Sequence, residues 1–300
     1  MRTEPDGPED LTSSSPRESS GPALPVMRLA VVGALLVLGF WPIVTGLYGS
    51  WFDEHANMEH GMLVLPTAAY MVWRSRARLR EIPVEPSAWG IVLLLAGAAQ
   101  AMLGLAAHWL WISRTAILVS IVGGIAAIHG FRMVRGLAYP ITLLLLMITP
   151  PTFIYERITL NLQLLASRLG ESCLEALGYP VLREGNILEL VGTRLSVQEA
   201  CSGIRSLFSI LFVCAVYDYF FVRANLMRAM ILLTAVPIAV LGNIGRIVAI
   251  GVASQRYGQL GLETAHVTFG YIAVLIGAAG CVVSHLLFGS IHRAWRSRHA

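Results

Sequence analysis

Apolar stretches of about the length of a membrane span recur along the chain from residue 27 to residue 288. A helix that crosses the hydrocarbon core of a bilayer needs roughly 20 mostly apolar residues. On this criterion the pattern predicts about eight transmembrane helices, of which the second and the fifth are short. Their expected ranges are 27–48, 60–73, 88–106, 109–130, 136–150, 202–222, 229–253 and 266–288. We therefore expect an all-α polytopic membrane protein.

One long segment, residues 151–200, interrupts the apolar pattern. Within it, apolar residues recur at steps of three and four from Ile154 to Leu177, which predicts an amphipathic helix that ends at Gly178. We expect this helix to lie along the membrane interface. Three short β-prone pieces follow and predict a small β-hairpin or meander that leads directly into residue 201. They are Val181–Glu184, Ile187–Val191 and Arg194–Gln198.

The two ends of the chain differ from this pattern. Residues 1–25 are rich in Ser, Pro and Glu and cannot bury enough apolar surface to offset the entropy lost on ordering, so we expect a disordered tail. The first apolar run lacks a compact basic start and a small-residue cleavage site, so we interpret it as an anchor rather than a signal peptide. Residues 26–290 then form one transmembrane domain, and residues 291–300 form a basic tail.

Arginines predict the orientation of the helices. Clusters follow the second, fourth, sixth and eighth predicted helices, and all four are cytoplasmic if the N-terminus is cytoplasmic, as the positive-inside rule requires. The clusters are Arg74, Arg76, Arg78 and Arg80; Arg132 and Arg135; Arg223 and Arg228; and Arg293, Arg296 and Arg298. Both termini are then cytoplasmic, and segment 151–200 lies outside.

Composition excludes several classes of function. With 56% hydrophobic and 13% charged residues, the chain is far more apolar than a soluble domain. The absence of lysine excludes a Ser-Lys dyad or a Schiff base. Most arginines flank apolar segments, so the net charge of +4 gives no reason to expect a nucleic-acid partner. The four cysteines lack paired C-x-x-C spacing, so we expect no metal site and no cofactor.

The predicted topology brings three residues into one outer layer. Cys201 lies at the outer N-terminal end of the sixth helix, where the helix dipole stabilises a thiolate. Arg246 lies roughly 10 Å below the outer end of the seventh helix at 1.5 Å per residue, and an arginine within an apolar run usually marks a function. His266 begins the eighth helix, and an imidazole can transfer protons near neutral pH.

Residues next to Cys201 and Arg246 are expected to support such a site. Ser202 and Gly203 allow close approach of a substrate backbone and leave amides that can stabilise an oxyanion. Arg205 lies one turn below the cysteine on the same face and is a second candidate cation. Asn243 shares a helix face with Arg246.

Structural interpretations remain open for these residues. Cys201 and His266 could simply pack, and Arg246 could extend to water or pair with Glu199 or Glu263. Arg205 could only brace the site.

Other polar residues have weaker claims. Arg114, in the fourth helix, is assigned to the inner half or the middle of the membrane and to a structural role. His60, at the outer start of the second helix, competes with the later histidine. Cys173 is outside, where a disulfide with the cysteine at 201 is conceivable. Cys214 and Cys281 fall within apolar spans and are expected to pack.

Four parts of the chain resemble the exosortases, which are related to the archaeosortases. Residues 200–206, Ala-Cys-Ser-Gly-Ile-Arg-Ser, resemble their cysteine motif, with isoleucine where leucine is common. Residues 243–246, Asn-Ile-Gly-Arg, resemble their arginine motif, and His266 with Gly270 resembles their histidine element. Residues 60–66, with Trp73 and the arginines after it, also resemble the family. The likeness covers approximately residues 27–290.

The resemblance implies a multipass cysteine peptidase or transpeptidase of the bacterial inner membrane, with its site on the periplasmic face. Its substrates would be exported proteins with a C-terminal sorting signal that consists of a short motif, an apolar helix and a basic tail. In the family's catalytic trio, Cys201 attacks a carbonyl to form a thioester, His266 is the general acid and base, and Arg246 stabilises the thiolate or the oxyanion. Membrane lipid is the other expected partner.

Two other classes of function stay open. A transporter or export channel would use Arg246, Arg205 and Arg114 to line an anion or polysaccharide path. Such a path should distribute polar residues through the bilayer, whereas the strongest candidates lie in the outer layer, and the chain shows no internal repeat. A noncatalytic assembly factor would keep its function after alkylation of Cys201.

Overall fold

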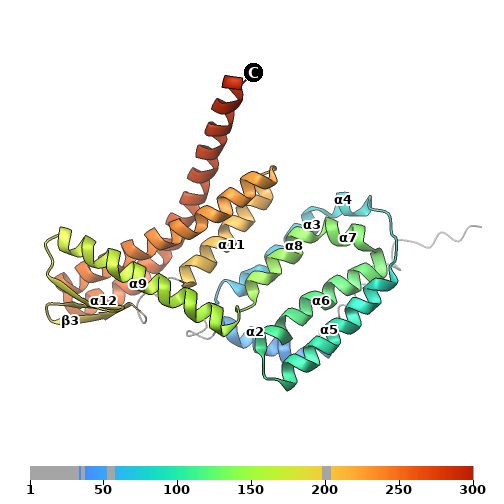
Figure 1. The fold of residues 1–300 in the computed structure, drawn as a ribbon, viewed down its shortest axis with the longest axis horizontal. Helices are drawn as coiled ribbons and strands as arrows, with labels where there is room; N and C mark the ends of the chain where they lie inside the picture. Colours follow the sequence, from blue (N-terminus) through green and yellow to red (C-terminus); the bar gives the residue numbers. More distant parts are fainter. Residues whose placement is uncertain (1–33, 35–37, 53–57, 198–203, 300) are drawn as a thin grey trace, which may run out of the picture.

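The computed structural model describes residues 34, 38–52, 58–197 and 204–299. The predicted tail 1–25, the beginning of the first predicted helix and residues 200–203 of the cysteine motif lie outside these residues. The described chain is mostly helical with one small sheet, and it forms two groups of elements that are joined where helix α8 leads into helix α9 (Figure 1).

The first group consists of seven labelled helices and one 3-10 turn. They are α2 (Trp41–Phe52), α3 (Gly61–Arg74), α4 (Arg76–Arg80), α5 (Ala88–Ala106), α6 (Leu110–His129), α7 (Phe131–Gly136) and α8 (Ala138–Leu143), which continues as η1 (Leu144–Met147). Helices α3, α5 and α6 agree with the predicted ranges 60–73, 88–106 and 109–130.

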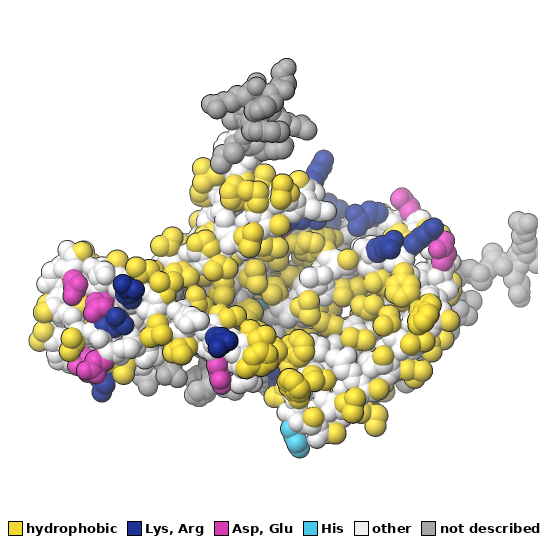
Figure 2. All heavy atoms as spheres, viewed as in Figure 1, with side chains coloured by type: hydrophobic (Ala, Val, Ile, Leu, Met, Phe, Trp, Pro, Cys, Tyr) yellow, Lys and Arg dark blue, Asp and Glu magenta, His cyan; other side chains and the backbone are white. Residues whose placement is uncertain are grey.

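Small residues bring α5 and α6 close together. A Cβ atom on Gly90 would lie 2.1 Å from the backbone nitrogen of Ala127, and one on Gly97 would lie 2.3 Å from the Ser120 hydroxyl. Helices in a bilayer associate through such small-residue contacts, since lipid removes the hydrophobic driving force between them. The outer surface of α5 is apolar (Figure 2). Its exposed large side chains are Trp89, Ile91, Val92, Leu95, Met102, Leu103 and Leu105.

The second group contains α9 (Thr152–Ala176), a three-stranded sheet, α11 (Ile204–Phe221) and α12 (Asn225–His299). Helix α9 confirms the predicted amphipathic helix, and Gly178 follows its end with a left-handed φ of 84°. The face that α9 buries against the other elements of this group is lined by Gln163, Ala166, Ser167, Gly170 and Leu174. Its position along the membrane interface stays a prediction.

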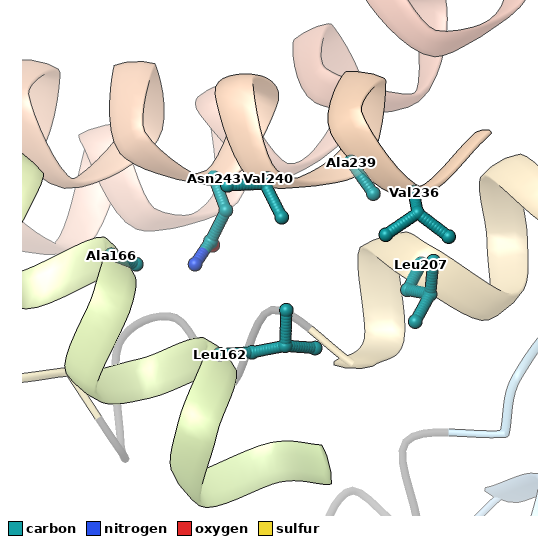
Figure 3. Close-up of a pocket in the computed structure, with 7 residues that line it drawn as sticks. All are labelled: Leu162, Ala166, Leu207, Val236, Ala239, Val240 and Asn243. Atoms are coloured by element: carbon teal, nitrogen blue, oxygen red, sulfur yellow. The ribbon is translucent and has the colours of Figure 1, made fainter. Parts of the chain in front are cut away.

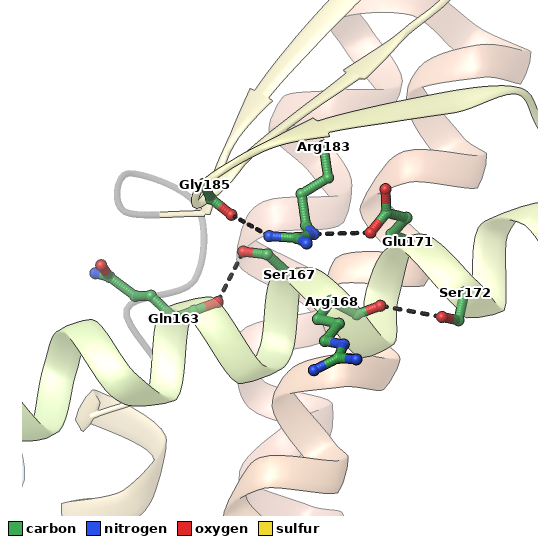
Figure 4. A network of polar contacts seen from close by, with 7 residues as sticks. All are labelled: Gln163, Ser167, Arg168, Glu171, Ser172, Arg183 and Gly185. Carbon is green, nitrogen blue, oxygen red and sulfur yellow. Dashed lines mark hydrogen bonds and ion pairs between the residues drawn. The ribbon is translucent and has the colours of Figure 1, made fainter.

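The sheet confirms the predicted meander. Strands β1 (Val181–Glu184), β2 (Ile187–Leu190) and β3 (Thr193–Ser196) pair antiparallel in this order. Leu188, Leu190 and Leu195 are buried in one cluster with residues of α9 and of the middle of α12. An ion pair also ties the sheet to α9, since Arg183 Nε lies 2.7 Å from Glu171 Oε2 (Figure 4).

The last two predicted spans form one element, which corrects the expected loop at 254–265. Helix α12 is helical throughout except at Gly258, whose φ of 62° and ψ of −141° produce a kink within a single residue. Glycine adopts this conformation without the steric penalty that a Cβ atom brings. His266 therefore lies inside a helix that resumes directly after Gly258, and the expectation that it begins a helix is wrong.

The C-terminal part of α12 packs against α11 in a parallel register. A Cβ on Gly277 would contact Ile210, and four residues further along both helices Cys281 contacts Cys214. Because both contacts move in the same direction along the chain, the two helices run parallel. Tyr217 and His285, whose Oη and Nδ1 atoms are 2.8 Å apart, continue the register. This parallel arrangement is what the predicted topology requires of the sixth and eighth spans.

The predicted fifth span, 136–150, is shorter and broken. It becomes α8 and η1, which end at Met147. Pro150 and Pro151 lack backbone N–H groups and cannot continue the hydrogen-bond ladder. Residues 138–147 meet α9 at an angle of 75°.

Membrane-spanning helices are present, but the number eight stays a prediction. Within the described residues, three helices are long and apolar enough to cross a membrane, or four if the bent pair 138–147 and 152–176 forms one span. The three are Ala88–Ala106, Leu110–His129 and Asn225–Gly258. Two shorter apolar helices, Ser206–Phe221 and Leu275–Ser290, accompany them.

Candidate functional site

The cysteine motif leads into α11. Cys201, Ser202 and Gly203 lie outside the described residues, and α11 begins directly after them at Ile204, which is fully buried. Arg205 belongs to the first turn of this helix, and its side chain lies outside the description. The predicted start of the sixth helix is therefore confirmed within two residues.

Asn243 and Arg246 lie on one buried face of α12, as their spacing predicts. Their exposed fractions are 2% and 8%, and each has an interaction partner. The adjacent residue, Ile247, packs against Gly170 of α9, where a Cβ atom would come within 2.9 Å of Ile247 Cγ2. Helix α9 therefore covers the part of α12 that carries the arginine motif.

A small pocket lies between α9, α11 and α12 (Figure 3). The amide of Asn243 points toward it, and the other lining side chains are apolar. They are Leu162, Ala166, Leu207, Val236, Ala239 and Val240. The pocket is thus an apolar space with one polar group, one helical turn from Arg246, and sequence reasoning missed it because its lining comes from three separate segments.

His266 lies in α12, eight residues after the kink at Gly258, and its side chain is outside the described part of the structure.

His60, the competing histidine, links the two groups of elements. Its side chain is 5% exposed, and its ring stacks on Phe208 of α11 with centroids 5.9 Å apart and an interplanar angle of 8°. Nε2 lies 3.0 Å from the carbonyl oxygen of Leu146. Because a carbonyl only accepts, Nε2 must carry the proton in this bond. These contacts give His60 a structural role between η1 and α11.

Arg114 lies at a different depth in the predicted membrane from the one that we expected. It lies four residues after the beginning of α6, is 7% exposed, and donates to the Thr149 hydroxyl at 3.0 Å and to the Gly46 carbonyl at 3.2 Å. In the predicted orientation this end of α6 is the outer one, so the assignment to the inner half or the middle is wrong. The assigned structural role agrees with its two hydrogen bonds.

Three buried polar side chains therefore hold the segment where η1 ends. Trp51 Nε1 donates to the Met147 carbonyl at 3.3 Å, next to the bonds that His60 and Arg114 make to Leu146 and Thr149. This segment directly precedes the bend into α9. Its anchors fix the direction in which α9 leaves the first group, and the double proline at 150–151 was the sequence signal for the bend.

The cysteines behave as expected where they are described. Cys173 is exposed on α9, and Cys214 and Cys281 are buried. A bond between Cys173 and Cys201 stays untested, since Cys201 lies outside the described residues. Within the described part of the chain, no group of three or more His, Cys, Asp or Glu side chains is arranged to hold a metal ion.

Comparison with protein families gives one match. The family model of the transmembrane exosortase matches residues 51–283, which is most of the chain and includes all three candidate site motifs. No curated protein and no solved structure matches.

Proposed function

This chain belongs to the transmembrane exosortase family, and we propose that it is a cysteine transpeptidase or peptidase that cleaves C-terminal sorting signals from exported proteins. The family is one of membrane cysteine transpeptidases. The proposed substrate carries a short motif, an apolar helix and a basic tail. The proposed site faces the periplasm from the bacterial inner membrane, with both termini in the cytoplasm.

The register between α11 and the C-terminal part of α12 is the observation that carries this proposal. Contacting positions are 67 residues apart at Cys214 and Cys281 and 68 apart at Tyr217 and His285. If the separation of 67 residues is added to position 201, the result is position 268, which is two residues from His266. The register thus supports a pairing of the cysteine and the histidine at the same depth.

In the proposed mechanism, the Cys201 thiolate attacks the carbonyl carbon of the scissile peptide and forms a tetrahedral oxyanion. Arg246 and backbone amides at Ser202 and Gly203 stabilise that negative charge. His266 protonates the leaving amine, which departs with the apolar helix and the basic tail, and a thioester remains. His266 then removes a proton from water or from an acceptor amine as it attacks the thioester. No cofactor takes part.

The pocket beside Asn243 supports a place for the substrate. An apolar substrate segment must pass from the bilayer to the site, and the pocket offers an apolar space one turn from Arg246. We propose that it marks the place where an apolar side chain of the sorting signal packs near the scissile peptide, with the Asn243 amide as a hydrogen-bond partner for the substrate backbone.

The decisive test compares Cys201→Ala and Cys201→Ser with the wild-type chain in cells that co-express a tailed substrate. We expect both variants to lose processing by at least about 10³-fold, since removal of a nucleophile abolishes the covalent route. Cys173→Ser is the matched control and should process normally. Accumulation of uncleaved substrate is read by immunoblot. Cleavage by both Cys201 variants would exclude the mechanism.

The transporter alternative finds no support in Arg114. An arginine that lines an anion path must face that path, whereas Arg114 is buried against Thr149 and Gly46.

A further inference from the structure

Two cysteines that the proposed mechanism does not use lie in contact inside the second group. Cys214 of α11 and Cys281 of α12 are 0% and 1% exposed, and their sulfur atoms are 2.7 Å apart. Neighbouring side chains from α11, from the connection after it and from the first part of α12 belong to the same buried cluster: Ile210, Val222, Ile231, Ala235 and Ala239. The two thiols are therefore held against each other by packing on all sides.

The helices are close enough at this level for a disulfide. A disulfide requires Cβ atoms about 3.5–4.5 Å apart and a sulfur–sulfur bond of about 2.05 Å. One turn toward the N-terminus of α11, a Cβ built on Gly277 would lie 3.4 Å from Ile210 Cβ. At the cysteines themselves, the sulfur atoms need to approach by well under 1 Å.

A proton acceptor is also in place. Asp218 follows Cys214 by four residues on the same face of α11, is 0% exposed, and within the described chain neither of its carboxylate oxygens has a hydrogen-bond partner. Thiol oxidation requires loss of the thiol proton, because the thiolate is the reactive form. Asp218 is one group that can take that proton, and the hydrogen-bonded pair Tyr217 and His285 adds further polar groups between the same two helices.

We propose that Cys214 and Cys281 are a dithiol that oxidises to a disulfide and so locks α11 to the C-terminal part of α12. In this reaction two S–H bonds break and one S–S bond forms. The two protons and two electrons pass to a membrane-permeant oxidant of the diazene dicarboxamide class, such as diamide, whose N=N bond becomes HN–NH. The bond fixes the register between α11, which follows the cysteine motif in the chain, and the part of α12 that carries His266. The inference does not depend on the proposed function, since the disulfide forms whether or not the chain cleaves a substrate.

The test uses full-length protein in detergent or nanodiscs, with Cys173→Ser and Cys201→Ser removing the other thiols. The protein is treated with diamide, digested without reduction and analysed by mass spectrometry. We expect one cross-linked peptide pair that contains Cys214 and Cys281, a mass loss of two hydrogens, and release by reductant. The midpoint of thermal unfolding should rise by several degrees on oxidation, because the bond restricts the unfolded chain.

Two controls make the outcome decisive. A further Cys214→Ser change should abolish both the cross-linked peptide and the stabilisation. In a background in which all native cysteines are serine, Ile210→Cys with Gly277→Cys provides a pair of the right separation in the same interface. If that engineered pair closes under diamide while Cys214 and Cys281 stay reduced, the proposal is wrong. It is equally wrong if the native pair closes only in protein that has lost its folded elution profile.

Discussion

Arg114 and Arg246 show at the scale of single residues how this chain buries charge. A guanidinium inside an apolar environment is costly unless hydrogen bonds compensate it. Arg114 meets this condition with the Thr149 hydroxyl and the Gly46 carbonyl. Arg246 also has an interaction partner, and it shares a buried helix face with Asn243, which lines the pocket one turn away. The two arginines look alike in sequence, and Arg246 differs from Arg114 in its position one turn from the pocket.

The pocket gives a prediction at this scale. Ala239 is 2% exposed and lines the pocket, so Ala239→Leu should fill part of its space. We expect substrate processing to fall roughly 10-fold or more, because one or two methylene groups in an apolar pocket discriminate by that amount. The rate is measured with the co-expressed substrate, and thermal unfolding confirms that the variant folds.

Ala229→Leu is the matched control for this change. Residue 229 is exposed near the beginning of the same helix, so the same added volume lies far from the pocket. Equal processing by the two variants would remove the pocket from the proposed substrate path.

At the scale of elements, the kink in α12 determines how two spans share one helix. The segment Asn225–Gly258 has 34 residues, which at 1.5 Å per residue is about 50 Å, whereas the hydrocarbon core is about 30 Å thick. An upright helix of this length extends beyond the core. Its final turns are the part that packs under the sheet and α9, where Gln255 donates to the Val191 carbonyl at 2.9 Å. The chain then returns at Gly258 without a loop.

Gly258→Ala should therefore disturb both stability and function. A Cβ at φ 62° and ψ −141° costs about 1–3 kcal/mol, and relief of that strain would shift the part of α12 that carries His266. We expect a lower midpoint of thermal unfolding and slower substrate processing. Gly289→Ala, at a helical position with no atom within 4 Å of the added Cβ, should leave both unchanged. A Gly258→Ala protein with wild-type stability would show that the kink needs no glycine.

The whole molecule depends on one junction between its two groups. Helix α9 leaves the first group at 75° to α8 and η1, and the segment before this bend is held by Trp51, His60 and Arg114. At the end of α8 that lies away from the bend, Arg228 of α12 lies over the ring of Tyr139, 5.3 Å from its centroid. Arginines also gather at that end near α4 and α7 (Figure 2). The predicted cytoplasmic clusters near α4, near α7 and at the beginning of α12 thus lie toward one end of the molecule.

Loss of the Arg114 anchor should loosen the junction. Thr149→Val keeps the shape of the side chain but removes the hydroxyl that accepts from Arg114, which leaves part of a buried cation without its partner. We expect a destabilisation of about 1–3 kcal/mol, with faster amide hydrogen exchange in the first turns of α9. Thermal unfolding and exchange mass spectrometry measure the two effects.

Thr45→Val serves as the control for this variant, since Thr45 is exposed and its hydroxyl bonds only to carbonyls of its own helix region, at Trp41 and Pro42. Unchanged exchange in α9 of Thr149→Val would mean that the other anchors suffice to hold the bend.

Sequence by itself determined the features that depend on local periodicity. The spans at 88–106 and 109–130, the amphipathic helix that ends before Gly178, and the β-meander follow from patterns within a few turns or strands. The spacing of Asn243 and Arg246 placed both on one face for the same reason. These patterns need no information about what lies across the molecule.

Tertiary structure alone decided how distant segments meet. The one-residue kink at Gly258, the pocket between α9, α11 and α12, the anchors of the bend, and the contact between Cys214 and Cys281 each depend on packing between residues far apart in the chain. Sequence periodicity reports which face of a helix is apolar, but it does not report which helix covers that face or in what register. The proposed pairing of the cysteine and histidine motifs depends on that register.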